Sequence, residues 1–154
     1  MKTTTISFLV DDSRVVLAEK KRGFGQGFLN GYGGKAQEGE TPEDAAIREL
    51  REEAGVAAAP DALEKVAVID FFDGKQPVTE CHIFFASAWD GEPRETEEMA
   101  KPAWFDRANP PFERMWAADR TWLPLVFNGQ KIRAKAYYEQ GMKKMDRFEH
   151  KPLS

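Results

Sequence analysis

Runs of alternating or β-branched apolar residues predict a chain built mainly from short strands. Residues 3–10 and 15–19 are such runs, and the polar residues Asp11-Asp12-Ser13 between them predict a turn. Residues 64–72 and 78–89 have the same character and flank the turn-forming segment 73–77, which predicts a hairpin. The remaining predicted strands cover residues 102–106, 131–138 and 144–150.

Residues 41–55 have helical spacing instead. Thr41 can cap the helix, Pro42 suits its first position, and Gly55 is a natural end. The apolar side chains of this helix form one stripe, made of Ala45, Ala46, Ile47, Leu50 and Ala54. A second helix is predicted at residues 114–127, interrupted by Pro124. Strands around one strong helix, with another helix late in the chain, predict an α/β or α+β sandwich.

Three carboxylates gather on the predicted helix 41–55. Glu49 and Glu53 are four residues apart and share a face, and Glu52 lies beside them. Their mutual repulsion would be removed by hard divalent cations, and oxygen ligands suit Mg²⁺ or Mn²⁺. Arg48 precedes Glu52 by four residues and can brace it. The alternative is an acidic helix face turned to solvent, which is the usual meaning of a charge run.

The segment before this helix, residues 20–35, is rich in glycine and in basic residues. Glycines allow close backbone approach, and lysines meet phosphates as point charges. The segment lacks the Gly-Lys-Ser/Thr ending of a P-loop. It is therefore either a phosphate-binding segment of another kind or a basic surface loop. Its basic side chains are Lys20, Lys21, Arg22 and Lys35, and its glycines are Gly23, Gly25, Gly27, Gly31, Gly33 and Gly34.

Composition narrows the classes of partner. A length of 154 residues suits one domain, residues 1–154, and the net charge of −4 disfavours a nucleic acid polymer. The only cysteine, Cys81, is expected to be a buried structural thiol, and His82 a structural histidine. The sequence shows no targeting segment and no apolar span, so we expect no membrane partner and a cytoplasmic location. We expect a monomer.

Residues 34–56, GKAQEGETPEDAAIRELREEAGV, carry a fixed pattern of glycine, arginine and carboxylates. The pattern runs from Gly34 through Glu40 and the segment 48–53 to Gly55, and it is identified as a Nudix box. The resemblance extends over nearly the whole chain. The segments 20–35, 98–105 and 115–125 resemble those of the animal MutT-homologue enzymes, which are oxidised purine nucleoside triphosphate diphosphatases.

The resemblance implies a mixed β-sheet between helices, and hydrolysis of 8-oxo-dGTP and related damaged purine triphosphates to monophosphate and pyrophosphate. Mg²⁺ would be held by Glu49, Glu52, Glu53, Glu98 and the Gly33 carbonyl. Lys20 and Lys35 would contact phosphates, and Asn30 the base. The base pocket would be walled by Thr5, Phe71 or Phe72, Met99, Trp116 and Trp122, and the substrate site would also include Tyr32, Gly33 and Gly34.

One departure concerns base recognition. Two adjacent aspartates read the purine edge in the resembled enzymes, whereas this chain has Ala118 followed by Asp119. We expect Asp119 alone to select the base, oxidised adenine to be a poor substrate, and room for an O6-alkylated guanine.

Alternatives remain open after this reading. Glu52 or Glu53 could orient the attacking water, or all three helix glutamates could be metal ligands alone. A Nudix hydrolase of dinucleoside polyphosphates or sugar nucleotides is the second hypothesis for the chain. The third is a non-catalytic nucleotide sensor, although such domains usually lose glutamates of the box and this chain keeps them all.

Overall fold

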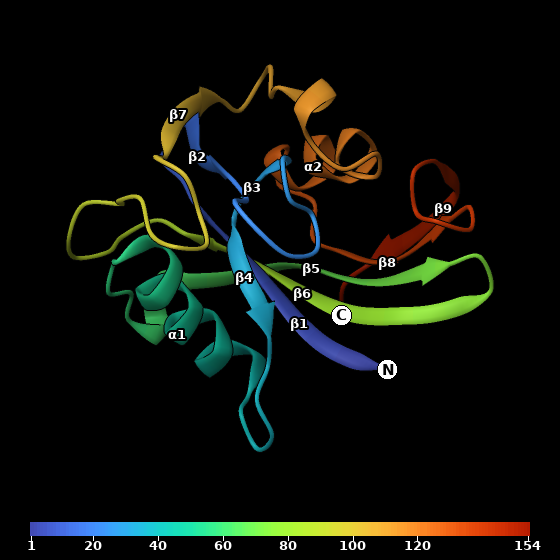
Figure 1. The fold of residues 1–154 in the computed structure, drawn as a ribbon, viewed down its shortest axis with the longest axis horizontal. Coiled ribbons are helices and arrows are strands. Elements are labelled where there is room, and N and C mark those ends of the chain that lie inside the picture. Colours follow the sequence, from blue (N-terminus) through green and yellow to red (C-terminus); the bar gives the residue numbers. More distant parts are fainter.

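The computed structural model describes residues 1–154, which form nine strands and two α-helices (Figure 1). Helix α1 covers Pro42–Ala54 and helix α2 covers Asp119–Phe127. Short 3₁₀ turns lie at Pro60–Ala62 and Phe112–Arg114. The strands are β1 Lys2–Leu9, β2 Arg14–Glu19, β3 Leu29–Asn30, β4 Tyr32–Lys35, β5 Leu63–Asp73, β6 Gln76–Ala86, β7 Ala103–Asp106, β8 Ile132–Tyr138 and β9 Met145–Pro152.

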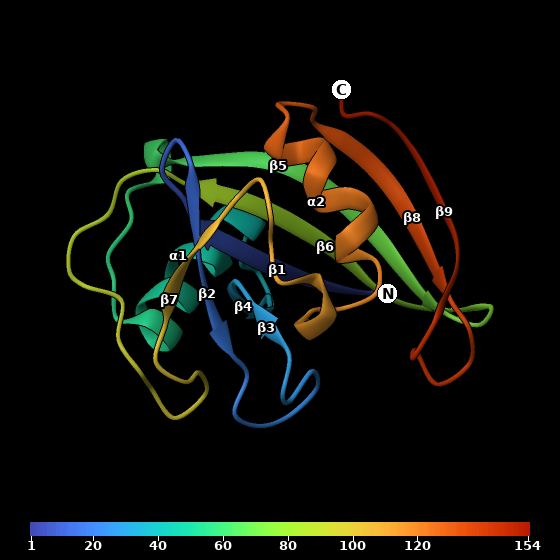
Figure 2. The same ribbon diagram turned by 90° about the horizontal axis from the view of Figure 1, so that it is seen from above.

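Six strands form a mixed sheet in the order β4-β1-β6-β5-β8-β9. The pairs β1–β6 and β5–β8 are parallel, and the other pairs are antiparallel. Helices α1 and α2 lie on opposite sides of this sheet (Figures 1 and 2). The mixed sheet between helices is therefore confirmed. A second, three-stranded sheet, β3-β2-β7, was not expected from the sequence.

Alternation along β1 separates two apolar cores. Phe8 points into the core under α2, where Trp122 and Leu123 are its neighbours. Leu9 points to the other side, where it joins Leu50 of α1 in a smaller cluster. Each fully buried side chain of this size stabilises the fold by about 1.5–3 kcal/mol before entropy is counted. Neither helix has the length and apolar character needed to cross a membrane.

The predicted ends of helix α1 are confirmed. The Thr41 hydroxyl accepts a hydrogen bond from the Asp44 N–H at 3.1 Å, which satisfies one free backbone donor of the first turn. Gly55 follows the helix with a φ of 74°, a left-handed conformation that favours glycine. The helix therefore places its carboxylates at fixed positions beside β4.

Several predicted boundaries were wrong. Helix α2 begins at Asp119 and not at residue 114, because residues 112–114 form a separate 3₁₀ turn. The predicted turn at residues 73–77 is shorter, since Asp73 already pairs with Gln76 across Gly74 and Lys75. Strand β6 accordingly begins earlier than predicted, and it ends at Ala86 instead of residue 89.

Glycines in β4 permit two close approaches. A Cβ on Gly33 would lie 1.7 Å from the Thr5 carbonyl oxygen of the neighbouring strand. A Cβ on Gly34 would lie 2.8 Å from a carboxylate oxygen of Glu49 on α1. The two glycines thus bring the sheet and the helix carboxylates together, which sets the geometry of the site described next.

Candidate active site

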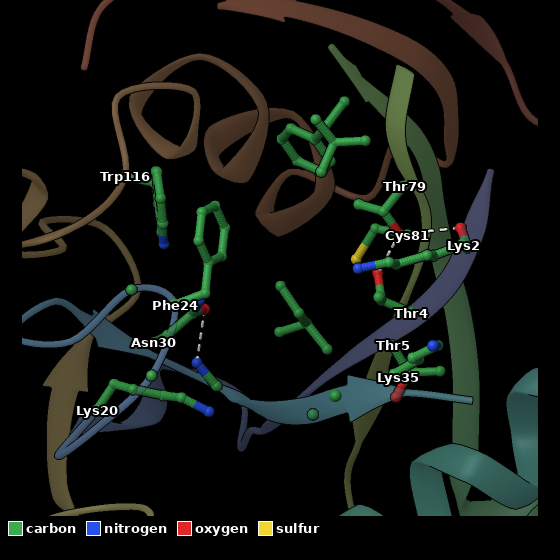
Figure 3. A pocket seen from close by; sticks show the side chains of 18 of the residues that line it. Lys2, Thr4, Thr5, Lys20, Phe24, Asn30, Lys35, Thr79, Cys81 and Trp116 are labelled. Atoms are coloured by element: carbon green, nitrogen blue, oxygen red, sulfur yellow. Dashed lines mark hydrogen bonds between the residues drawn. The ribbon is translucent and has the colours of Figure 1, made fainter. Parts of the chain in front are cut away.

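One cavity of about 610 Å³ lies over the face of the six-stranded sheet that carries α2. Its walls come from β1, β3, β4, β5, β6, β8, α2 and the loops around residues 20–25, 98–99, 116 and 142. Figure 3 shows Phe24 and Trp116 together on one side of the cavity and Thr4, Thr79 and Cys81 on the other. The volume is in the range that holds a small-molecule ligand.

The polar part of the cavity contains Glu53. Its carboxylate accepts a hydrogen bond from the Gly33 N–H at 3.0 Å and faces the Lys20 ammonium at 3.7 Å. The same ammonium lies 3.8 Å from Glu98, so one lysine charge stands between two carboxylates. Burial raises the pKa of Glu53 to about 7, although the lysine opposes that shift. The Arg22 guanidinium, hydrogen-bonded to Glu98, lowers the pKa of that carboxyl.

Arg48 braces the remaining helix carboxylates. Its guanidinium contacts Glu40 at 2.8 Å, Glu49 at 2.9 Å and Glu52 at 3.2 Å. The hydrogen bonds from Arg48 lower the pKa of Glu40 to about 2. Burial raises the pKa of Glu49. The expected contact between Arg48 and Glu52 is therefore present, together with two contacts that helical spacing did not indicate.

The three carboxylates predicted as metal ligands do not have equal surroundings. The side chains of Glu49 and Glu53 are 11% and 7% exposed, whereas that of Glu52 is 57% exposed. No group of three or more acidic, histidine or cysteine side chains is close enough to enclose a metal. The arrangement instead uses Lys20 and Arg48 as counter-charges. Two buried carboxylates with raised pKa values still offer hard oxygen ligands of the kind that Mg²⁺ prefers.

Aromatic side chains form the opposite part of the cavity. The Trp116 ring stacks on Phe24 with centroids 5.0 Å apart and lies 4.8 Å from Phe28. Phe24 is 70% exposed, so this stack continues the cavity wall out to solvent. Such rings offer flat apolar surfaces to a planar ligand.

Asp119 is the one carboxylate among these aromatic groups. Its two oxygens accept hydrogen bonds from the Trp116 backbone N–H at 3.1 Å and the Trp122 indole N–H at 3.0 Å. Burial raises the pKa of Asp119 to about 7, while these two donors oppose the shift. Each oxygen keeps a lone pair for a ligand.

One further polar group of the cavity has unused hydrogen-bonding capacity. The Asn30 side-chain oxygen accepts from the Gly31 N–H at 2.8 Å, and no hydrogen bond in the structure uses the Asn30 amide group as a donor. Thr5 also lines the cavity, but it shares a face of β1 with Leu9, so its unpartnered hydroxyl points to the α1 side of the sheet. Buried polar groups without partners are uncommon in proteins and are expected to meet a ligand or water.

Most of the predicted site residues line this one cavity. They are Thr5, Lys20, Asn30, Gly33, Gly34, Lys35, Glu53, Phe71, Glu98, Met99, Trp116, Asp119 and Trp122.

Four predicted residues do not line the cavity. Glu49 and Glu52 are engaged by Arg48 beside it. Tyr32 is fully buried in the core under α1, on the other side of the sheet. Phe72 stacks on Tyr137 with centroids 4.7 Å apart, away from Phe71, which is the residue that faces the cavity. Strand alternation explains this outcome, because neighbouring residues of β5 point to opposite faces.

Sequence reasoning missed several residues that line the cavity, namely Lys2, Thr4, Ile6, Phe24, Val78, Thr79, Cys81, Tyr138 and Met142. For Tyr138 a signal was present, because Ala134, Ala136 and Tyr138 alternate along β8 toward the buried face. No such pattern marks Phe24, which lies between two glycines in an irregular loop.

We predict that Asp119→Asn changes how stability depends on pH. An unfolded aspartate loses its proton near pH 3.8 and the native Asp119 near about 7. Between these values the folded state binds more protons, so the free energy of unfolding falls as pH rises. Asp119→Asn removes this contribution, and it should also cost about 1–3 kcal/mol because one N–H donor loses its acceptor.

Urea unfolding of both proteins without metal, between about pH 5 and about pH 8, measures the two slopes. The slope should be smaller for Asp119→Asn. Equal slopes would show that the carboxyl titrates as an ordinary aspartate.

The chain is similar to known proteins over most of its length. The model described as the NUDIX domain matches residues 1–126. The chain is 47% identical over 139 residues to the oxidized purine nucleoside triphosphate hydrolase of Danio rerio, covering 90% of this chain and 86% of that protein. It is 46% identical over 129 residues to the protein of that name from Mus musculus, covering 83% and 81%.

Solved structures share the fold. The MutT protein from Bacillus halodurans superposes with a TM-score of 0.82 at 22% identity and covers 100% of both chains. The MutT NUDIX hydrolase from Burkholderia pseudomallei gives 0.71 at 28% identity, covering 81% of this chain and 97% of its own. From the matched domain and these relatives, the chain belongs to the Nudix family.

Proposed function

We propose that this protein hydrolyses oxidised purine nucleoside triphosphates of the 8-oxo-dGTP type to the monophosphate and pyrophosphate. The observation that carries the proposal is a single cavity with two chemically different parts. One part joins Lys20, Lys35 and the box carboxylate Glu53, and the other joins aromatic rings to the buried Asp119. Relatives sharing almost half of the sequence carry the name of this activity. Removing damaged triphosphates would sanitise the nucleotide pool and so prevent damaged bases from entering DNA.

The polar part suits a triphosphate and a divalent cation. Divalent cations such as Mg²⁺ are general in the family. Glu49, Glu52, Glu53, Glu98 and the Gly33 carbonyl are the oxygen donors that would hold Mg²⁺, or Mn²⁺. The bound metal would neutralise phosphate charge and lower the pKa of a water molecule.

This chain's own residues would position the substrate. Lys20, now shared by Glu53 and Glu98, carries a charge that could pair with phosphate oxygens once a cation neutralises these carboxylates. Lys35 lines the same cavity and would contact the phosphates as well. Because a phosphoanhydride transition state needs mainly positioning and charge neutralisation, these residues suffice without a covalent nucleophile.

The aromatic part suits a purine. Trp116 and Phe24 offer flat rings, and Asp119 offers acceptor oxygens to the N1–H and amino group of a guanine. Asn30 would reach the base with its free amide donors. The residues of the cavity supply every group that this proposal uses, so we propose that residues 1–154 act as one domain and as a monomer. We further propose a cytoplasmic location.

Two other functions compete with this proposal. A Nudix pyrophosphohydrolase of another nucleoside diphosphate derivative would use the same polar part with a different occupant of the aromatic part. A non-catalytic sensor would bind nucleotide without metal-dependent turnover. Pyrophosphate release with and without Mg²⁺, measured on oxidised, alkylated and normal triphosphates and on dinucleoside polyphosphates and sugar nucleotides, separates the three.

We predict that Glu53→Gln folds normally and loses at least about a hundredfold in kcat. The amide keeps the shape of the side chain but removes the charge that would hold the metal. Glu43→Gln on the same helix is the matched control, because Glu43 is half-exposed and contacts only Lys65. Wild-type turnover by Glu53→Gln at saturating Mg²⁺ would rule out the metal assignment.

A second prediction separates Glu98 from its acidic neighbours. Glu98 faces Lys20 and the cavity, whereas Glu95 pairs with Lys21 at 3.0 Å outside it. Glu98→Ala should therefore raise the Mg²⁺ concentration needed for half-maximal rate and lower that rate, and Glu95→Ala should change neither. Metal titrations of the two variants test this, and identical curves would remove Glu98 from the site.

A third prediction concerns base selection. With Ala118 in place of a second carboxylate, the wild type should favour 8-oxo-dGTP over 2-oxo-dATP, because one carboxylate cannot supply both the donor and the acceptor that the oxidised adenine edge needs. Ala118→Asp should raise kcat/KM for 2-oxo-dATP relative to 8-oxo-dGTP, with O6-methyl-dGTP and dGTP measured beside them. Strong 2-oxo-dATP hydrolysis that Ala118→Asp leaves unchanged would show that this position does not read the base.

A further inference from the structure

The hydroxyl of Tyr138 lies at the buried end of the cavity with an unused proton. Tyr138 lines the cavity and is 1% exposed. Its oxygen accepts a hydrogen bond from the Ala118 N–H at 2.9 Å, and no hydrogen bond in the structure uses the O–H as a donor. A buried donor left unpaired costs free energy, so its presence in a cavity wall indicates an acceptor on a ligand.

The position of this hydroxyl is fixed by its neighbours. The Tyr138 ring meets Trp116 edge to face, with centroids 6.1 Å apart, and packs beside Phe71 at 6.4 Å. The Ala118 N–H holds the oxygen from one side. Burial raises the pKa of Tyr138 to about 12, so the hydroxyl keeps its proton at neutral pH and acts as a donor.

An acceptor lies beside this donor. Asp119 follows Ala118 in the chain, lines the same cavity, and keeps a lone pair on each oxygen after accepting its two N–H groups. Ala118 itself is fully buried and does not line the cavity. The polar group recorded at this residue is the hydroxyl of Tyr138, which accepts the Ala118 backbone N–H.

The two threonine hydroxyls on the cavity side of the sheet are already satisfied. Thr4 and Thr79 bond each other at 2.8 Å, and Thr79 also donates to the Lys2 carbonyl at 3.1 Å. These two side chains lie with Cys81 on the side of the cavity opposite to Trp116 (Figure 3). Tyr138 is thus the hydroxyl donor available next to Asp119.

We propose that Tyr138 determines base specificity by donating a hydrogen bond to the carbonyl oxygen at position 6 of a guanine-type base, while Asp119 accepts from N1–H and the 2-amino group. The inference rests on the proposed function, since it assigns the base-reading groups of that site. A guanine edge presents one acceptor beside two donors, which matches a hydroxyl beside a carboxylate. An adenine edge presents an amino donor at position 6, which leaves the hydroxyl proton unpaired.

The test pairs a protein change with a substrate change. Tyr138→Phe removes the hydroxyl and keeps the ring, and 2-aminopurine deoxynucleoside triphosphate lacks the position 6 oxygen and the N1–H of dGTP but keeps its 2-amino group. We expect Tyr138→Phe to lower kcat/KM for dGTP about tenfold and to leave that for the 2-aminopurine nucleotide unchanged. Tyr137→Phe is the matched control, because Tyr137 is the next residue on β8 and stacks on Phe72 outside the cavity.

A merely structural role would give a different result. If Tyr138 only holds the Ala118 N–H, its loss would shift α2 and lower kcat/KM for both nucleotides by the same factor. An equal loss of kcat/KM therefore overturns the proposal. Circular dichroism checks that the variant folds. In the wild type, 6-thio-dGTP carries a poor acceptor at position 6 and should be used less well than dGTP, and equal use would also overturn the proposal without any variant.

Binding of dGMP and of the 2-aminopurine monophosphate, followed by fluorescence, gives the same comparison without turnover, and wild-type hydrolysis of 8-oxo-dGTP is measured beside it. Hydrolysis of 8-oxo-dGTP with no base-dependent effect of Tyr138→Phe overturns the role of Tyr138 alone. Base-dependent binding without hydrolysis supports that role and overturns the proposed function. If no purine nucleotide is bound or hydrolysed, both the role of Tyr138 and the proposed function are overturned.

Discussion

The close approach of helix α1 to strand β4 is the constraint on which the candidate site depends. Gly33 and Gly34 leave no side chain between the helix and the sheet, so the Gly33 N–H reaches the carboxylate of Glu53 and Gly34 packs against that of Glu49. Any larger residue at these two positions would collide with the Thr5 carbonyl or with Glu49 itself. Two acidic side chains are therefore buried at the edge of a cavity, where burial raises their pKa values.

The negative charges of the buried carboxylates require positive charges nearby, and two side chains from different parts of the chain supply them. Arg48 comes from the same helix and contacts three carboxylates, while Lys20 comes from the end of the second strand. The two side chains are about equally exposed, at 23% and 24%, but only the lysine lines the cavity. The arginine therefore compensates the carboxylates beside the cavity, while the lysine places a positive charge where a phosphate would bind.

The sequence was most informative where chemistry demands a fixed spacing. The helix with its Thr41 cap and Gly55 end, and the contact between Arg48 and Glu52, follow from local rules and were predicted. The mixed sheet between helices followed from the family resemblance. Positions that depend on strand register were less certain, and only the structure shows that Phe71 faces the cavity while Phe72 does not.

Individual long-range contacts could not be predicted from local patterns. Tyr138 and Ala118 are far apart in sequence, so no local pattern indicates that the hydroxyl of one meets the backbone of the other. The start of α2 was also misplaced, because residues 112–114 satisfy helical composition yet form a separate turn.

The surroundings of Cys81 affect how readily the protein is oxidised. This thiol lines the cavity yet is 2% exposed, and burial raises its pKa to about 12. The thiolate is the form that attacks peroxides and disulfides, and at neutral pH almost none of this side chain is in that form. The proposed substrates of this protein arise under oxidative stress. The protein holds its only cysteine as the protonated thiol, which reacts most slowly with oxidants. A sulfenic acid at this position would block the pocket.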